Sequence, residues 1–200
     1  MSGDLSEEIA ALVKDAGRVA VDTETTGLDW RTDSLKLCQL CAPTVGPVII
    51  QITGLAPHLR SLLEDPSVTK VFHFAPFDLR FLEAALGART TTVMCTKAGS
   101  KLLNPELPSN GHSLSALLHR HFGISLDKGA VRTSDWGSAQ LTEAQTDYAT
   151  GDVVSLLRLL DAEMELLQSR DLVDEFAAIC AYMPVDAHLE VTGIPNPLAY

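Results

Sequence analysis

The sequence predicts an α/β domain with a mixed central sheet flanked by helices. Three short apolar segments come first, separated by turns that contain Gly, Pro or Asp, which is the pattern of strands joined by short loops. Further strand-like segments then alternate with helical ones, and the last third has apolar residues at helical spacing. This order of elements indicates one domain over residues 1–200.

The predicted strands are short apolar runs bounded by turn residues, and they cover 18–24, 35–41, 47–52, 69–74 and roughly 91–95. The predicted helices cover 55–64, about 76–86, 97–103, 113–122, about 142–169 and 172–182. Pro76 favours a helix start and Gly87 a helix end. Thr142 and Gln145 form a capping box at the start of the longest helix. We expect a loop at 104–112, a polar connection at 124–140 and a C-terminal tail over about 183–200.

Composition narrows the function class. Hydrophobic residues make up 46% and charged residues 20% of the chain, values typical of a soluble globular protein. No apolar run approaches the roughly 20 residues that span a bilayer, so we expect no membrane partner. The polar, acidic start MSGDLSEE is unlike a targeting signal, which makes the cytoplasm the expected location.

The net charge of −11 is unusual for a protein that binds nucleic acid. Residues 87–134, however, carry six Lys or Arg against two acids. Such a local basic stretch could bind a few phosphates, but it would not bind a long polyanion through counterion release alone.

The four cysteines are expected as free thiols. Cys38 and Cys41 form a CxxC pair, but in a strand positions three apart point to opposite faces. Because no second CxxC completes a zinc site, we expect neither a metal nor a redox role for this pair.

Acidic residues in three separate segments suggest a site. Asp22 and Glu24 share one face of the first strand, with their backbones about 7 Å apart. Asp78 falls in the first turn of a helix that directly follows a strand, where an anion is favoured and α/β proteins bind ligands. Tyr148 and Asp152, four residues apart, stack on one face of a later helix. Each feature alone has an ordinary structural explanation.

Taken together, the four acids predict a metal site. The set contains no sulfur and no paired histidine, and oxygen-only ligands suit Mg²⁺ or Mn²⁺ rather than zinc. Two such cations would neutralise the acids of the core strand and bind a phosphodiester.

With these four acids and the tyrosine, the chain resembles a DEDD-type 3′–5′ exonuclease of the tyrosine-bearing subclass, in the RNase D-like family. The segments that carry the resemblance are VDTETTGL (21–28), HFAPFDLRFL (73–82) and DYATGDVVSLLRL (147–159), and it extends through CTKAGSKLL, SLSALLHRHFGISLDK and SDWGSAQLTEAQ. The chain is most similar to the short stand-alone nano-RNase branch, which removes very short oligoribonucleotides. The resemblance implies a ribonuclease H-like, DnaQ-type fold, release of nucleoside 5′-monophosphates, and a ring-shaped homo-oligomer as an assembly to test.

The resemblance also implies roles for individual residues. Asp22 would bridge two metals, Glu24 and Asp152 would complete the water-activating site, and Asp78 would serve the second metal. Tyr148 would orient the attacking water, since a phenol with an ordinary pKa of about 10 is neutral at pH 7.

Substrate contacts are expected on both sides of these acids. By resemblance, Leu28 would wedge against the terminal base and Thr25 and Thr26 would meet the terminal sugar. Further candidates are base-pocket residues and phosphate contacts: His73, Phe74 and Phe77 for the base, and Lys128 and Arg132 for phosphate. Trp136 is either a stacking residue or a loop anchor.

Two alternatives stay open. The same chemistry could act on DNA, because the catalytic residues do not distinguish the two sugars. A non-catalytic nucleic-acid-binding module would be expected to have lost an acid or the tyrosine, and all five are present. Nucleotide-binding P-loop, dinucleotide-binding and serine-hydrolase motifs do not occur.

Overall fold

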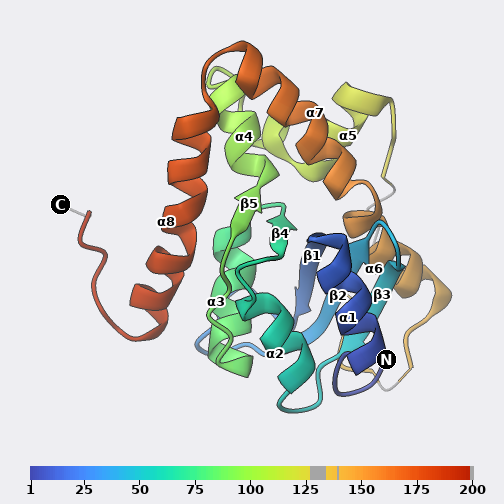
Figure 1. The fold of residues 1–200 in the computed structure, drawn as a ribbon. Coiled ribbons are helices and arrows are strands. Elements are labelled where there is room, and N and C mark those ends of the chain that lie inside the picture. Colours follow the sequence, from blue (N-terminus) through green and yellow to red (C-terminus); the bar gives the residue numbers. More distant parts are fainter. Residues whose placement is uncertain (127–133, 139, 199–200) are drawn as a thin grey trace.

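A five-stranded sheet in the order β3-β2-β1-β4-β5 forms the centre of the computed structural model, which describes residues 1–126, 134–138 and 140–198 (Figure 1). Its strands are β1 (Arg18–Thr25), β2 (Leu35–Ala42), β3 (Gly46–Gln51), β4 (Thr69–Phe72) and β5 (Val93–Cys95). β1, β2 and β3 pair antiparallel, whereas β4 pairs parallel to β1 and β5 parallel to β4. The predicted mixed sheet is therefore confirmed.

Eight α-helices are described around this sheet, together with a short 3-10 helix at Ser109–His112. They are α1 (Glu7–Ala16), α2 (Pro57–Glu64), α3 (Ala75–Leu86), α4 (Thr96–Leu103), α5 (Leu114–Phe122), α6 (Glu143–Val154), α7 (Leu156–Ser169) and α8 (Val173–Val191). α6 packs against β1, β2 and β3, while α3 contacts β2, β4 and β5. β1 thus lies in the middle of the molecule, and its residues 19–21 have no exposed surface.

Local capping chemistry sets several helix ends where the sequence predicts them. The Thr142 hydroxyl accepts from the Gln145 backbone N–H, and the Gln145 side chain accepts from the Thr142 backbone N–H, which completes the capping box. Gly87 and Gly123 end α3 and α5 with positive φ angles of 65° and 68°, a conformation that a residue without Cβ adopts at low cost.

One helix, α1, is missing from the sequence prediction. Ser6 caps it by accepting from the Ile9 N–H, Glu7 and Glu8 lie in its first turn, and Gly17 ends it. These signals are present in the sequence. The acidic residues at the N-terminus, however, make the buried face of the helix, formed by Ala10 and Val13, hard to recognise there.

The predicted single helix from about Thr142 to Ser169 is wrong, because the chain breaks at Ser155 into α6 and α7. The two halves pack on different neighbours: α6 lies on β1, β2 and β3, and α7 lies mainly on α4 and α5. Helical spacing in the sequence does not record that change of direction.

The predicted tail from about 183 is also wrong over its first part, since α8 continues through Pro184 to Val191. An interior proline removes one helical hydrogen bond and costs about 3 kcal/mol. Tertiary contacts beyond the proline offset this cost: Ala187 is buried, and Asp186 accepts from Arg80 of α3 at 2.9 Å. Figure 1 shows α8 running beside α3 and α4.

Within the described part of the chain, no helix combines the length and the apolar character that crossing a bilayer requires.

Candidate active site

The C-terminal parts of β1 and α6 bring three acids together. Asp22, Glu24 and Asp152 each offer a carboxylate oxygen, and these three atoms lie within 4.8 Å of one another. Asp22 and Glu24 alternate with buried Thr23 along β1, so both point to the face that α6 covers. Asp152 is 8% exposed and reaches them from α6. Segments about 130 residues apart in sequence thus form one cluster.

These carboxylates fit a divalent cation. All three ligand atoms are oxygens, which suits Mg²⁺ or Mn²⁺. Three carboxylates at this separation repel one another when they are ionised, and a bound cation removes that repulsion.

Asp78 lies outside this group of three. It is 3% exposed in the first turn of α3, and its Oδ1 accepts from the Thr23 hydroxyl at 2.7 Å. Since Thr23 separates Asp22 from Glu24, this bond ties Asp78 to the same end of β1. Burial raises the pKa of Asp78 above its ordinary value, and the hydrogen bond from Thr23 opposes the rise.

Cys38 of β2 lies opposite Thr23 of β1 in the sheet and is fully buried. Burial raises the pKa of this thiol, and the charges of Asp78 and Asp22 raise it further. Cys41 pairs with Ala20, on the opposite face of the sheet, and burial raises the pKa of its thiol too.

Tyr148 is held by a small apolar cluster on the α6 face. Its ring lies 5.7 Å from the ring of Trp136, which is 4% exposed and packs with Leu37 and Ala149. The Gln145 amide donates to Ser134 Oγ and to the Asp135 carbonyl, which fixes the segment that carries the tryptophan. Of the two roles left open for Trp136, the structure shows the loop anchor.

The predicted substrate contacts after β1 lie in a loop of residues 26–34. Leu28 is 81% exposed at its tip. The Thr25 hydroxyl donates to the Gly27 carbonyl at 2.5 Å, and Thr26 Oγ1 accepts from the Ser34 N–H at 2.9 Å. Both hydroxyls therefore also shape the loop.

The candidates before α3 have mixed environments. His73 Nδ1 lies 2.9 Å from Thr96 Oγ1. Phe74 is exposed with a positive φ of 75°, rare for a bulky residue, and the Lys97 ammonium lies 4.3 Å from its ring centre. Phe77 is half-buried against Phe81, with ring centres 4.9 Å apart, so core packing accounts for much of its surface.

Lys128 and Arg132 lie outside the described residues, so their predicted phosphate contacts stay predictions. The rest of the basic stretch does not share one surface. Arg89 precedes β5 and lines a groove against α8, whereas Lys97 follows β5 on the side of Phe74.

Sequence reasoning missed Gln39. It pairs with Asp22 across β1 and β2, and its buried amide has no hydrogen-bond partner. A glutamine in the apolar run LKLCQLC is a visible signal, because buried amides are normally satisfied.

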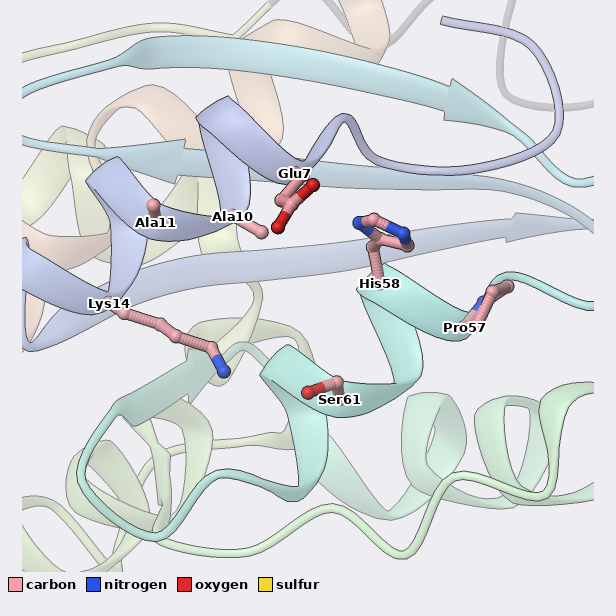
Figure 2. A pocket seen from close by; sticks show the side chains of 7 residues that line it. All are labelled: Glu7, Ala10, Ala11, Lys14, Pro57, His58 and Ser61. Carbon is pink, nitrogen blue, oxygen red and sulfur yellow. The ribbon is translucent and has the colours of Figure 1, made fainter.

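A pocket of about 480 Å³ lies between α1 and α2, away from the acid cluster (Figure 2). Its wall includes Glu7, His58 and Lys14, and Lys14 is paired with Asp65 at 3.1 Å. None of the predicted site residues lines it.

Comparison with known proteins gives consistent matches. The family model described as 3′–5′ exonuclease matches residues 2–167. DNA polymerase I of Aquifex aeolicus is 35% identical over 88% of this chain and 32% of its own length, and ribonuclease D of Cronobacter turicensis is 32% identical over 80% and 43%. The chain therefore spans less than half the length of these curated relatives.

Two solved structures of one protein match this chain over nearly their full length. NrnC of Brucella melitensis bound to pGG is 32% identical, with a TM-score of 0.88 over 100% of this chain and 96% of that one. The same protein with bound Mg²⁺ is 31% identical, with the same TM-score and coverage.

Proposed function

We propose, from the premise that this chain belongs to the 3′–5′ exonuclease family in its RNase D-like branch, that it hydrolyses short oligoribonucleotides from the 3′ end and releases nucleoside 5′-monophosphates. Membership in that family confirms the resemblance noted in the sequence. The observation that carries the proposal is the meeting of Asp22, Glu24 and Asp152 within 4.8 Å. The pGG-bound NrnC neighbour supports a very short substrate.

Two divalent cations fit the proposed site. Asp22, Glu24 and Asp152 would hold them, and Asp78 would contribute from the neighbouring helix start. When bound, such ions lower the pKa of a water molecule and stabilise the leaving 3′ oxygen. Tyr148 would orient the attacking water through its hydroxyl. The contact of its ring with Trp136 would hold that hydroxyl in place. Leu28 would contact the terminal base.

DNA is the second candidate substrate, because DNA polymerase I of Aquifex aeolicus is 35% identical. A panel of 2-, 3- and 20-nucleotide RNA and DNA substrates, resolved by product size, separates the two. We expect rapid hydrolysis of the 2- and 3-nucleotide RNAs. Faster hydrolysis of the 20-nucleotide DNA would contradict the proposed substrate and support the alternative.

Removal of metal is expected to abolish hydrolysis. EDTA should silence the enzyme, and Mg²⁺ or Mn²⁺ added in excess should restore it, because the ions would supply the activation of water and the stabilisation of the leaving 3′ oxygen. The metal-loaded protein should also melt at a higher temperature, since an ion that binds only the folded state stabilises it. Full activity in EDTA would reject the metal site.

A Tyr148→Phe variant is expected to lower kcat by about 10²-fold, which is typical of a lost group that assists proton transfer or water positioning. Metal affinity should stay unchanged, since the phenylalanine ring keeps the contact with Trp136. Tyr182→Phe is the matched control, because the Tyr182 hydroxyl has no hydrogen-bond partner. Equal rates for the two variants would remove Tyr148 from the mechanism.

A cytoplasmic location and a ring-shaped homo-oligomer remain part of this proposal. Light scattering of the purified protein tests the second.

A further inference from the structure

One carboxylate on the last helix joins the two elements that flank the acid cluster. Glu190, near the end of α8, accepts from the Trp30 indole N–H at 3.3 Å and from the Arg31 guanidinium at 3.1 Å through Oε1. Its second oxygen, Oε2, accepts from Arg80 of α3. Trp30 and Arg31 belong to the loop after β1, and Arg80 lies two residues beyond Asp78.

The loop of residues 26–34 is braced by hydrogen bonds within itself, and its Trp30 packs against the hydrophobic core. The Thr26 N–H donates to the Ser34 carbonyl at 3.0 Å, and the Asp29 N–H donates to Asp33 Oδ2 at 2.9 Å. An added Cβ on Gly27 would lie 2.4 Å from the same Asp33 oxygen, so a larger residue there would displace the Asp33 carboxylate from its bond to Asp29. These bonds brace the loop internally, and the side-chain hydrogen bonds from it to another element that we find among the described residues run to Glu190.

Glu190 accepts these bonds with a side chain that is 35% exposed. Burial acts to raise the pKa of its carboxyl, but the bonds from Trp30, Arg80 and Arg31 outweigh burial and lower it, so the group is ionised near neutral pH. Hydrogen bonds to an ionised acceptor are about twice as strong as neutral ones. The Arg31 guanidinium also lies 4.3 Å from the Trp30 ring centre, which orders both donors.

We infer that Glu190 is a positioning residue for substrate binding: it fixes the loop of residues 26–34, and with it Leu28, relative to helix α3. The inference rests on the proposed function in so far as Leu28 contacts the substrate. Leu28 is 81% exposed and cannot be held in place by packing of its own. Asp186 has a different task, since it accepts from Arg80 but has no bond to the loop.

Amide hydrogen exchange tests whether Glu190 fixes the loop, and it needs no activity assay. Glu190→Ala should speed amide exchange in residues 26–34, because the loop loses its tie to α8. Trp30→Phe, which removes only the indole donor, should give a smaller increase, and Glu190→Gln, which keeps an acceptor, should restore part of the protection. Glu175→Ala, an exposed acid in the first turn of α8, is the matched control. Unchanged exchange in Glu190→Ala and Trp30→Phe overturns the inference.

Kinetics test the functional part. Glu190→Ala should raise KM for a dinucleotide about tenfold while kcat stays within about threefold, the pattern expected when binding is lost but chemistry is not. Asp186→Asn should leave KM unchanged, which separates loop positioning from attachment of α8. A mobile loop with an unchanged KM overturns the inference. If the wild-type chain hydrolyses no oligonucleotide, the proposed function fails, while the exchange experiment still decides whether Glu190 holds the loop.

Discussion

An Asp22→Asn variant is expected to lose hydrolysis by about 10³-fold or more while it keeps its fold. Asparagine has the same volume but lacks the charge that holds a divalent cation beside Glu24 and Asp152. Each tenfold loss in rate corresponds to about 1.4 kcal/mol of the activation barrier, so the change removes at least about 4 kcal/mol of transition-state stabilisation.

The same substitution should leave the metal-free protein as stable as the wild type, or more stable. Without a cation, the three carboxylates repel one another, and removal of one charge relieves that repulsion. The rise in melting temperature on addition of Mg²⁺ or Mn²⁺ should disappear, which thermal melts with and without metal would measure.

Asp147→Asn is the matched control for this variant. Asp147 is exposed on α6, next to Tyr148, and its replacement makes the same change in net charge. It should retain wild-type rates. Hydrolysis by Asp22→Asn within tenfold of the wild type would show that the acid cluster is not the catalytic centre.

A Glu163→Gln variant is expected to stabilise the fold at alkaline pH. Glu163 has no exposed surface, and neither carboxylate oxygen has a hydrogen-bond partner among the residues that the structure describes. It lies where α7 meets α4 so closely that a Cβ on Gly99 would come within 2.8 Å of Glu163 Oε2. Burial raises the pKa of Glu163 to about 9, and the charge of Arg120 only partly opposes this rise.

The direction in which the free energy of unfolding changes with pH follows from proton linkage. The unfolded chain releases the Glu163 proton near its ordinary pKa of about 4.3, whereas the folded chain keeps it until about 9. Between these values the unfolded state binds fewer protons, so the free energy of unfolding falls as pH rises. Glutamine cannot ionise, and this part of the pH dependence should vanish.

Denaturant unfolding at pH 5 and pH 8 measures the effect. At pH 8 the variant should exceed the wild type by on the order of 5 kcal/mol, and at pH 5 the difference should shrink to about 1 kcal/mol. Glu165→Gln, an exposed position on the same helix, should change little at either pH. An equal stability of Glu163→Gln and wild type at pH 8 would mean that Glu163 is ionised and solvated in the folded protein.

The sequence by itself determined the order of the five strands, the helices between them and the helix ends that local chemistry sets, but it did not reveal α1 or the break between α6 and α7. The capping box at Thr142 and the glycines at 87 and 123 act through bonds within a few residues, so their effect is visible without tertiary contacts. The sequence also predicted one metal site from four acids, Asp22, Glu24, Asp78 and Asp152, on their oxygen-only chemistry and the family resemblance. The structure groups Asp22, Glu24 and Asp152, and it ties Asp78 to Thr23 beside them.

Only the tertiary structure decided where helices break or continue against the local pattern, and which side chains meet across the fold, since long-range packing outweighs local preference at these positions. The turn at Ser155 and the passage of α8 through Pro184 both oppose the local pattern and follow from what each helix contacts. The same holds for Trp136, whose burial against Leu37 makes it an anchor, and for Glu190. A carboxylate about 160 residues from its indole partner forms its bonds only after the chain has folded.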